Sequence, residues 1–274
     1  MRYLNIFSAL VAALMSMAMG NVQAEEKPDA ASPEVLEAGH NKNYLYLTGE
    51  QDSLSPAGSG GGGGIEWTHS NAPKKMSTTL GFSRLNLAGS SVSYLKLGAF
   101  WKHENGVAYH VEARGGSGNQ SGSSFDYRML KGGITFLLLD RLSLDLEDEY
   151  IHVAQTEANL LRSTVNYVPL PWLGTVVKYQ ETTGGSFRMD FLSGELDLYI
   201  KGIKIYGGYG SGRYVLNQNF IPNSTVLNTQ EKFYGIKFPI GSSELDLIWD
   251  LISQPGTQRK SVTLGLKVPF LGEN

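Results

Sequence analysis

Apolar and ionised residues alternate along several long segments of this chain, and this alternation limits the possible folds more than any other feature. Residues 243–251 read SELDLIWDL, with Leu245, Leu247, Trp249 and Leu251 in one phase and Glu244, Asp246 and Asp250 in the other. Successive side chains of a β-strand point to opposite faces, so each such strand has an apolar face and an ionised face. A soluble core would exclude the acids, and a loop would exclude the leucines. The pattern therefore favours a sheet whose leucines face lipid and whose carboxylates face a polar lumen.

This period of two continues from Asn43 to the end of the chain and predicts fourteen strands. Their expected ranges are 43–51, 62–70, 76–87, 91–103, 106–117, 124–138, 141–154, 159–169, 173–183, 186–200, 203–215, 229–239, 243–253 and 258–270. Most are much longer than the ~5–6 residues of an ordinary strand and reach the ~9–11 residues of a tilted membrane strand. The prediction is an all-β fold, a single closed antiparallel transmembrane barrel of about fourteen strands. A soluble protein of two packed sheets is the competing interpretation.

The chain begins MRYLNIFSALVAALMSMAMGNVQA, in which Arg2 precedes an apolar run that ends in small residues. This is the pattern of a secretory signal peptide. We expect residues 1–24 to be a cleaved signal, 25–42 a polar periplasmic leader and 43–274 the barrel. No later segment reaches the ~18 apolar residues of a spanning helix.

Composition excludes several classes of function. The chain has no cysteine, so disulfides, thiol chemistry and cysteine-bound metal are excluded. Its formal net charge is −3, and it has no basic field for nucleic acid. Glycine is abundant, at 33 of 274 residues, which fits β structure with many turns.

The connections predict which end of the barrel faces which compartment. With a periplasmic N-terminus, the tight turns 71–75, 103–106, 139–141, 169–173, 201–202 and 239–242 all lie on the periplasmic side. The Gly-, Ser- and Asn-rich segments 54–60, 116–124, 154–159 and 216–228 lie on the other side and are expected to be longer loops, although the connections near 88–90, 184–185 and 254–257 on that side are short too. Short periplasmic turns and longer external loops are typical of outer-membrane barrels.

The apolar phase switches within two of the expected strands. Phe187, Met189 and Phe191 are odd-numbered, whereas Leu196 and Leu198 are even-numbered, and a similar switch occurs near residues 130–133. We interpret both switches as β-bulges at glycine, because dividing 186–200 would leave two strands too short to span. If this interpretation is wrong, the strand number becomes twelve or sixteen.

Aromatic residues gather toward the expected strand ends and predict interfacial girdles. They include Tyr44, Tyr46, Trp67, Trp101, Tyr167, Trp172, Tyr199, Phe238 and Phe270.

Residues in the opposite phase to the leucines are expected to line the lumen. The candidates are Lys96, His110, Glu112, Arg114, Asp145, Glu147, Arg162, Lys178, Arg188, Asp190, Asp197, Lys204, Lys237, Asp246 and Asp250. Both signs are interleaved, which argues against a strongly ion-selective pore. The short turns place Lys237 beside Asp246 and Lys204 diagonal to Asp197, so cross-strand ion pairs are expected. These charges either support the wall as cross-links or tune the passage of solutes.

Cofactor and enzyme signatures are weak. None of the five histidines has the spacing of a helical metal site, and we expect no cofactor, metal or catalytic residue. Lipid-hydrolysing barrels use a His-x-Ser pair on one strand face, and the sequence has none. His152 and Ser163 could meet across a hairpin, although no orienting acid is evident.

Together the signal peptide, the alternation, the order of the turns and the final strand SVTLGLKVPF resemble those of bacterial outer-membrane β-barrels of the porin-like class, over residues 43–270. Barrels of that class commonly end on an aromatic residue that the assembly machinery reads, whereas here Leu-Gly-Glu-Asn follows Phe270. The resemblance implies the outer membrane of a Gram-negative cell, with lipid, lipopolysaccharide and the barrel assembly machinery as partners. We expect a passive, weakly selective pore for small polar solutes. A structural barrel that anchors an envelope protein and a lipid-modifying enzyme are the alternatives.

Overall fold

The computed structural model describes residues 42–56, 58–71, 74–87, 89–103, 106–185, 188–215 and 226–271. The predicted signal peptide and all of the leader except Lys42 lie outside these residues. No helix in the described part of the chain is long and apolar enough to cross a membrane.

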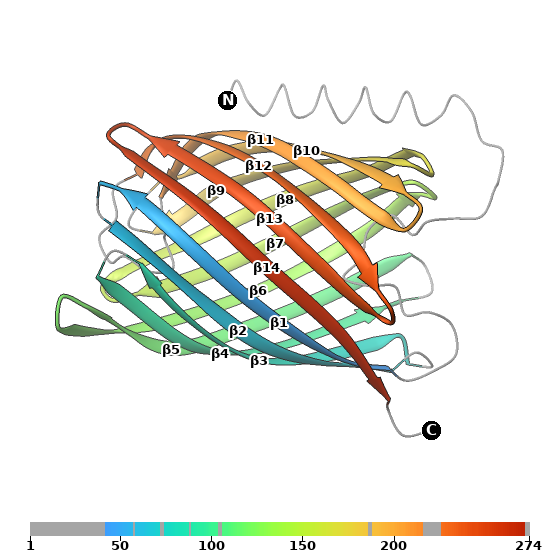
Figure 1. Ribbon diagram of the computed structural model, residues 1–274, viewed down its shortest axis with the longest axis horizontal. Helices are drawn as coiled ribbons and strands as arrows, with labels where there is room; N and C mark the ends of the chain where they lie inside the picture. Colours follow the sequence, from blue (N-terminus) through green and yellow to red (C-terminus); the bar gives the residue numbers. More distant parts are fainter. Residues whose placement is uncertain are drawn as a thin grey trace.

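Fourteen antiparallel strands form one closed barrel in chain order, as predicted. The strands are β1 (Lys42–Ser55), β2 (Gly58–Asn71), β3 (Met76–Leu87), β4 (Ser90–Lys102), β5 (Val107–Gln120), β6 (Ser123–Leu139), β7 (Leu142–Val153), β8 (Thr156–Leu170), β9 (Leu173–Gly185), β10 (Asp190–Ile200), β11 (Ile203–Val215), β12 (Val226–Ile240), β13 (Ser243–Gln254) and β14 (Thr257–Leu271). Each pairs with its sequence neighbours, and β1 pairs with β14 to close the ring. Figure 1 shows the strands as steeply tilted ribbons around a common axis.

Both ends of the barrel carry tight turns, which corrects the expected difference between short and long connections. We call the end with Lys42 and Leu271 the terminal end and the opposite one the distal end. At the distal end β1 and β2 are separated only by residues 56–57, β5 and β6 by 121–122, and β7 and β8 by 154–155. Among the connections at the distal end, only those at 186–189 and 216–225 are longer than two residues. The Gly- and Ser-rich segments near residues 58–64 and 115–120 belong to strands β2 and β5, because their residues pair with the neighbouring strands β1 and β6.

Left-handed backbone at both central residues explains two of these tight turns. Ser121 and Gly122 have φ of 51° and 87°, and Lys201 and Gly202 have 50° and 81°. Positive φ at both positions defines the type I′ turn, whose twist matches that of the two strands it joins. A two-residue hairpin also fixes the register of its strands.

The outer surface of the barrel is apolar, as the alternation predicts. Large apolar side chains are exposed along the middle of the strands, including Leu80, Leu95, Leu97, Leu130, Leu196, Leu264 and Tyr234. Lys96, between Leu95 and Leu97, lies instead in an ion pair with Glu66 and Glu112. The leucines thus face outward and the charges inward.

The two predicted bulges are absent, because the apolar residues that switch phase face inward. Pairing of β10 with β9 and β11 is continuous through Ser193 and Gly194, and pairing of β5 with β6 is continuous through 130–133. Phe191 is 8% exposed and lines the interior. A register shift in β6 occurs elsewhere, between Leu137 and Leu139.

Apolar residues of the inner face form a packed cluster inside the distal half of the barrel. Its buried members are Val92, Phe125, Tyr127, Met129, Ile151, Val153, Ala158, Leu160 and Met189. Tyr127 and Leu160 are 0% exposed. The interior is therefore polar along most of its length, but a core fills it beside the distal ends of β4 and β6–β8. We call this group the inner apolar cluster.

Three aromatic residues that were expected in the girdles lie on the inner face. Lys267 Nζ lies 4.1 Å from the centre of the Tyr44 ring, and the Tyr46 ring lies against the backbone of Gly265. The Tyr199 hydroxyl donates a hydrogen bond of 3.3 Å to Asp197 Oδ2. The outward rings include Trp67, Trp101, Trp172 and Phe270.

The outward phase leads to a stability prediction at Leu97, which is 60% exposed in the middle of β4. A cation at the centre of a lipid-facing strand costs about 2–4 kcal/mol. Leu97→Arg should lower the free energy of unfolding from lipid vesicles by that amount. Leu97→Met, which keeps an apolar chain of similar size, should change it by less than about 1.5 kcal/mol. Equal effects of the two substitutions would contradict a lipid-facing Leu97.

Candidate solute pathway through the barrel

Two cavities follow one another inside the barrel from its terminal end, and a third lies at the distal rim. The terminal cavity has a volume of about 590 Å³ and is lined by residues that include Tyr44, Tyr46, Glu66, Lys96, His110, Glu112, Asp145, Glu147, Lys237 and Lys267. The middle cavity, of about 540 Å³, is lined by residues that include Glu50, Arg162, Lys178, Phe191, Ser193, Glu195, Tyr206, Glu231, Phe233, Asp250 and Arg259. The distal cavity, of about 780 Å³, lies at the distal rim: it is lined by Phe191, Thr229 and Gln254 from the inner face and by residues in the outward phase of their strands, which include Tyr179, Asp190 and Arg213.

Shared residues connect these cavities. Phe191 and Thr229 line both the middle and the distal cavity. Glu147 of the terminal cavity receives a hydrogen bond of 2.8 Å from Nη1 of Arg162, which lines the middle cavity. A solute that passed from the terminal to the middle cavity would therefore meet this ion pair, and Phe191 lies between the middle cavity and the distal rim.

Acidic and basic side chains of the terminal cavity form a ladder across β2, β4 and β5. Lys96 Nζ lies 3.0 Å from Glu66 Oε2 and 3.4 Å from Glu112 Oε2. Arg114 Nη2 lies 2.6 Å from Glu112 Oε1, and its guanidinium carbon lies 5.4 Å from the centre of the Tyr94 ring. Each charge in this ladder has a partner of opposite sign.

Glu147 is the centre of a second network. Its Oε1 lies 3.1 Å from His110 Nε2 and 3.2 Å from Lys131 Nζ, and its Oε2 accepts from Arg162. Arg162 also lies 3.3 Å from Glu149 through Nη2. The chain thus places two cations and an imidazole around one buried carboxylate, whose charge they compensate.

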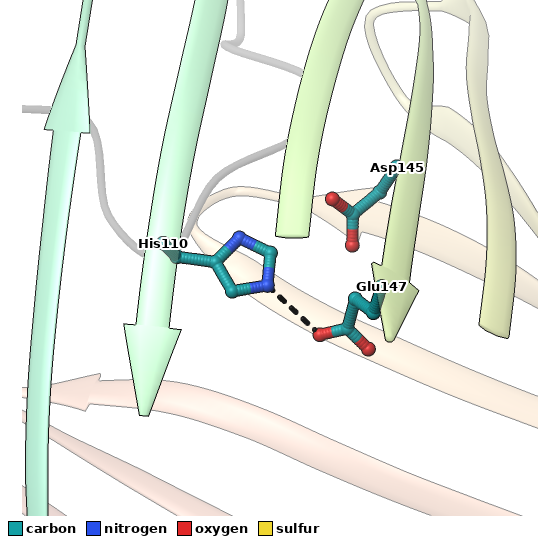
Figure 2. Close-up of side chains that lie close together, drawn as sticks. All are labelled: His110, Asp145 and Glu147. Atoms are coloured by element: carbon teal, nitrogen blue, oxygen red, sulfur yellow. Dashed lines mark hydrogen bonds and ion pairs between the residues drawn. The ribbon is translucent and has the colours of Figure 1, made fainter. Parts of the chain in front are cut away.

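The same network brings His110, Asp145 and Glu147 together, with one ligand-type atom of each within 4.8 Å of the others. Figure 2 shows His110 reaching from its strand toward the two carboxylates, with a hydrogen bond to Glu147. The sequence gives no metal-site spacing for this group. In the structure Lys131 and Arg162 occupy the oxygens of Glu147, and Asp145 Oδ1 accepts a 2.8 Å hydrogen bond from Thr135. This arrangement satisfies the carboxylates with protein donors.

Three further networks complete the inner face. Lys204 pairs with Glu195 and Asp197, Lys237 with Glu244 and Asp246, and Arg259 with Glu50 and Asp52. The two pairs expected across short turns are confirmed, at 3.8 Å for Lys237 with Asp246 and 3.0 Å for Lys204 with Asp197.

The structure places thirteen of the fifteen predicted lumen residues in these networks or on the walls of the inner cavities, and Lys178 and Asp250 line the middle one. Asp190 is one exception, because it shares the outward phase of Leu196 on β10 and pairs with Arg213 at the distal rim. Arg188 is the other, because β10 begins only at Asp190 and Arg188 is an exposed residue of the connection before it. The prediction treated 186–200 as one strand and so gave Arg188 a face that it does not have.

Several charges of the inner face are not among the predicted lumen residues. Glu50 lies near the end of the expected strand 43–51, Asp52 lies just after it, and Lys131 lies where a bulge was expected. Glu50 and Asp52 share the even phase of Tyr44 and Tyr46, and this phase was the signal that could have found them.

Six inward rings lie over glycines of a neighbouring strand. The ring and glycine pairs are Tyr46 with Gly265, His110 with Gly133, Phe125 with Gly118, Phe191 with Gly210, Tyr206 with Gly235 and Phe233 with Gly208. A Cβ on Gly235, for example, would lie 2.6 Å from the Tyr206 hydroxyl oxygen. The missing side chain leaves room for each ring to lie against the wall. This pairing accounts for part of the high glycine content.

His152 and Ser163 do not meet. His152 pairs with Glu157 and Ser163 pairs with Leu146, so the two residues lie six positions apart along the β7–β8 hairpin. At ~3.3 Å a residue this is a separation of about 20 Å. The hairpin therefore does not join them as base and nucleophile.

The Glu147 network leads to a prediction on stability. Glu147→Gln leaves Lys131 and Arg162 facing an amide, and removal of one partner from a buried charge network costs about 3 kcal/mol. The free energy of unfolding should fall by that amount. Asp126→Asn is the matched control, because its pair with Arg128 is 64% and 70% exposed and should contribute less than about 1 kcal/mol. Equal losses in the two variants would contradict a structural role for the Glu147 network.

No family model matches the sequence, and no curated protein matches it. The fold does resemble solved structures. One is the CymD monoaromatic hydrocarbon channel, with a TM-score of 0.63 and 7% identity over 90% of this chain and 95% of that one. Another is the toluene transporter TbuX of Ralstonia pickettii, with a TM-score of 0.57 and 8% identity over 85% and 90%. A third is the outer membrane protein Omp33 of Acinetobacter baumannii, with a TM-score of 0.53 and 11% identity over 84% and 99%. The closed wall, its apolar outer face and these likenesses give the chain the fold of an outer-membrane β-barrel of the porin-like class.

Proposed function

We propose that the protein is a passive channel of the outer membrane for small polar and charged solutes. The observation that supports this most directly is the succession of two cavities with charged walls inside a closed barrel. Backbone polar groups are paired around the whole ring, so the wall is stable in lipid, and the ionised side chains offer hydrated solutes a polar path. The solved structures with this fold include proteins described as channels and a transporter.

Weak selectivity is the second part of the proposal. Acids and bases alternate around the lumen, and most of them compensate each other within 4 Å. A ring of one sign would select ions of the opposite sign, whereas a compensated lumen has no strong preference. We therefore expect comparable passage of small cations and anions.

A channel for hydrocarbons is the second candidate. The inner apolar cluster favours it, as do the descriptions of CymD and TbuX. However, Tyr127 and Leu160 of the cluster are 0% exposed, so the cluster is filled by its own side chains. The three cavities, by contrast, have charged walls. Polar solutes are thus the better match to the space that is open.

Conductance measurements test the channel directly. The purified barrel in a planar lipid bilayer should give discrete current steps in simple salt solution. Absence of steps above background would reject the channel and favour a structural or anchoring barrel. Hydrolysis of labelled lipid that is lost in a His152→Ala variant would instead favour a lipid-modifying enzyme.

The pairing of rings with glycines predicts how the conductance can be changed. In Gly235→Val the new side chain displaces the Tyr206 ring from the wall into the lumen, so the single-channel conductance should roughly halve. Gly194→Val is the matched control, because a Cβ there would meet nothing closer than 4.0 Å, and Gly194 is exposed in the outward phase of β10. Its conductance should remain that of the parent. Equal conductance in the two variants would contradict a solute path past Tyr206.

A further inference from the structure

Three charges in the middle cavity stand apart from the compensated networks. Arg162, Glu195 and Arg259 of this cavity each have an ion-pair partner. Within the described part of the chain, Lys178, Glu231 and Asp250 have none within ion-pair distance. In addition, Asp250 Oδ1 is a buried oxygen without a hydrogen-bond partner.

Strand register places these three charges on two sides of the cavity. Glu231 pairs with Ile252, and Phe233 pairs with Asp250, so the two carboxylates are diagonal neighbours on β12 and β13. Lys178 lies on β9, in the same hydrogen-bonded row as Glu231. The row runs from Lys178 through Ser193 and Gly210 to Glu231, which is about 14 Å along the wall at ~4.8 Å a strand. A cation thus faces an acidic pair across a stretch of small residues.

The space between them is open and partly aromatic. Lys178 is exposed to the cavity, and Phe191 and Phe233 line the same cavity. Each of these rings lies against a glycine of the wall, Gly210 or Gly208, beside the open space. An aromatic face attracts an ammonium group and also packs against apolar atoms.

We propose that the middle cavity is a selectivity site for small zwitterionic solutes of the amino-acid type. Lys178 receives the carboxylate, the Glu231 and Asp250 pair receives the ammonium group, and Phe191 and Phe233 contact the remainder of the solute. The inference rests on the proposed channel function and names the class of solute that the middle cavity favours. A lone cation or anion gains one of these contacts and is repelled at the other side, whereas a zwitterion gains both.

Swelling rates of proteoliposomes in solutes of matched size test this assignment. L-alanine is the zwitterion, lactamide is a neutral molecule of the same mass, and lactate is the anion. For the parent barrel we expect alanine to enter about threefold faster than lactamide. In Lys178→Met and in Glu231→Gln this ratio should fall to about one, while the rate for lactamide stays unchanged.

Two further variants separate a site for zwitterions from an attraction between Lys178 and Glu231 themselves. Lys178→Glu combined with Glu231→Lys exchanges the charges and should restore the preference for alanine, because the zwitterion can bind in the reverse direction. Lys201→Asn removes a cation from a tight turn at the terminal end and should leave the ratio as in the parent. If Lys178 and Glu231 only compensate each other, both single variants keep the parent's ratio, and the proposal is overturned.

The neutral solute distinguishes failure of this inference from failure of the channel. If neither lactamide nor alanine enters, the proposed function itself is wrong. If lactamide enters and the alanine ratio does not respond to Lys178 or Glu231, the channel stands and the zwitterion site is rejected.

Discussion

Hydrogen bonding between the first and last strands is the interaction on which the rest of this structure depends. The whole of β1, from Lys42 to Ser55, pairs with Leu271 to Gln258 of β14. In hydrocarbon an unpaired backbone group costs several kcal/mol, so two open edges of this length could not persist in a membrane. Closure in turn defines an inside and an outside, and only then does the alternation of leucine with acid correspond to two different solvents.

Much of the fold could be predicted from local pattern, because a side-chain period of two and the length of the segments are properties of the strands themselves. The strand number and the outward phase of residues such as Leu97 and Leu264 are confirmed. The loops were predicted less well, since Gly- and Ser-rich segments have little apolar pattern and are held in the sheet by their neighbours. The same limit applies to Met129 and Phe191. A lone strand cannot show whether an apolar residue faces lipid or the inner apolar cluster, because both surroundings are apolar.

On the inner face, too, some ion pairs could be predicted from neighbouring sequence and others depend on closure of the barrel. Lys237 with Asp246 and Lys204 with Asp197 could be predicted, because a tight turn fixes which residues lie opposite each other. Arg259 with Glu50 could not, because these residues are 209 positions apart and meet only when the barrel closes. The position of Lys178 relative to Glu231 depends on the register of three successive strand pairs. Sequence therefore indicates which charges face inward, but the assembled ring determines which of them are compensated.

The pairing of inward rings with glycines has a consequence for how such a barrel can diversify. The width of the lumen depends on the glycines, which leave room for the inward rings, as much as on the size of those rings. At Gly235 and Gly265, where an added Cβ would meet only ring atoms first, a change to a larger residue alters the clearance at one depth without a direct clash with the backbone of the wall. Permeability and structural integrity thus reside in different atoms of the same strand, and natural variation can adjust the first without endangering the second.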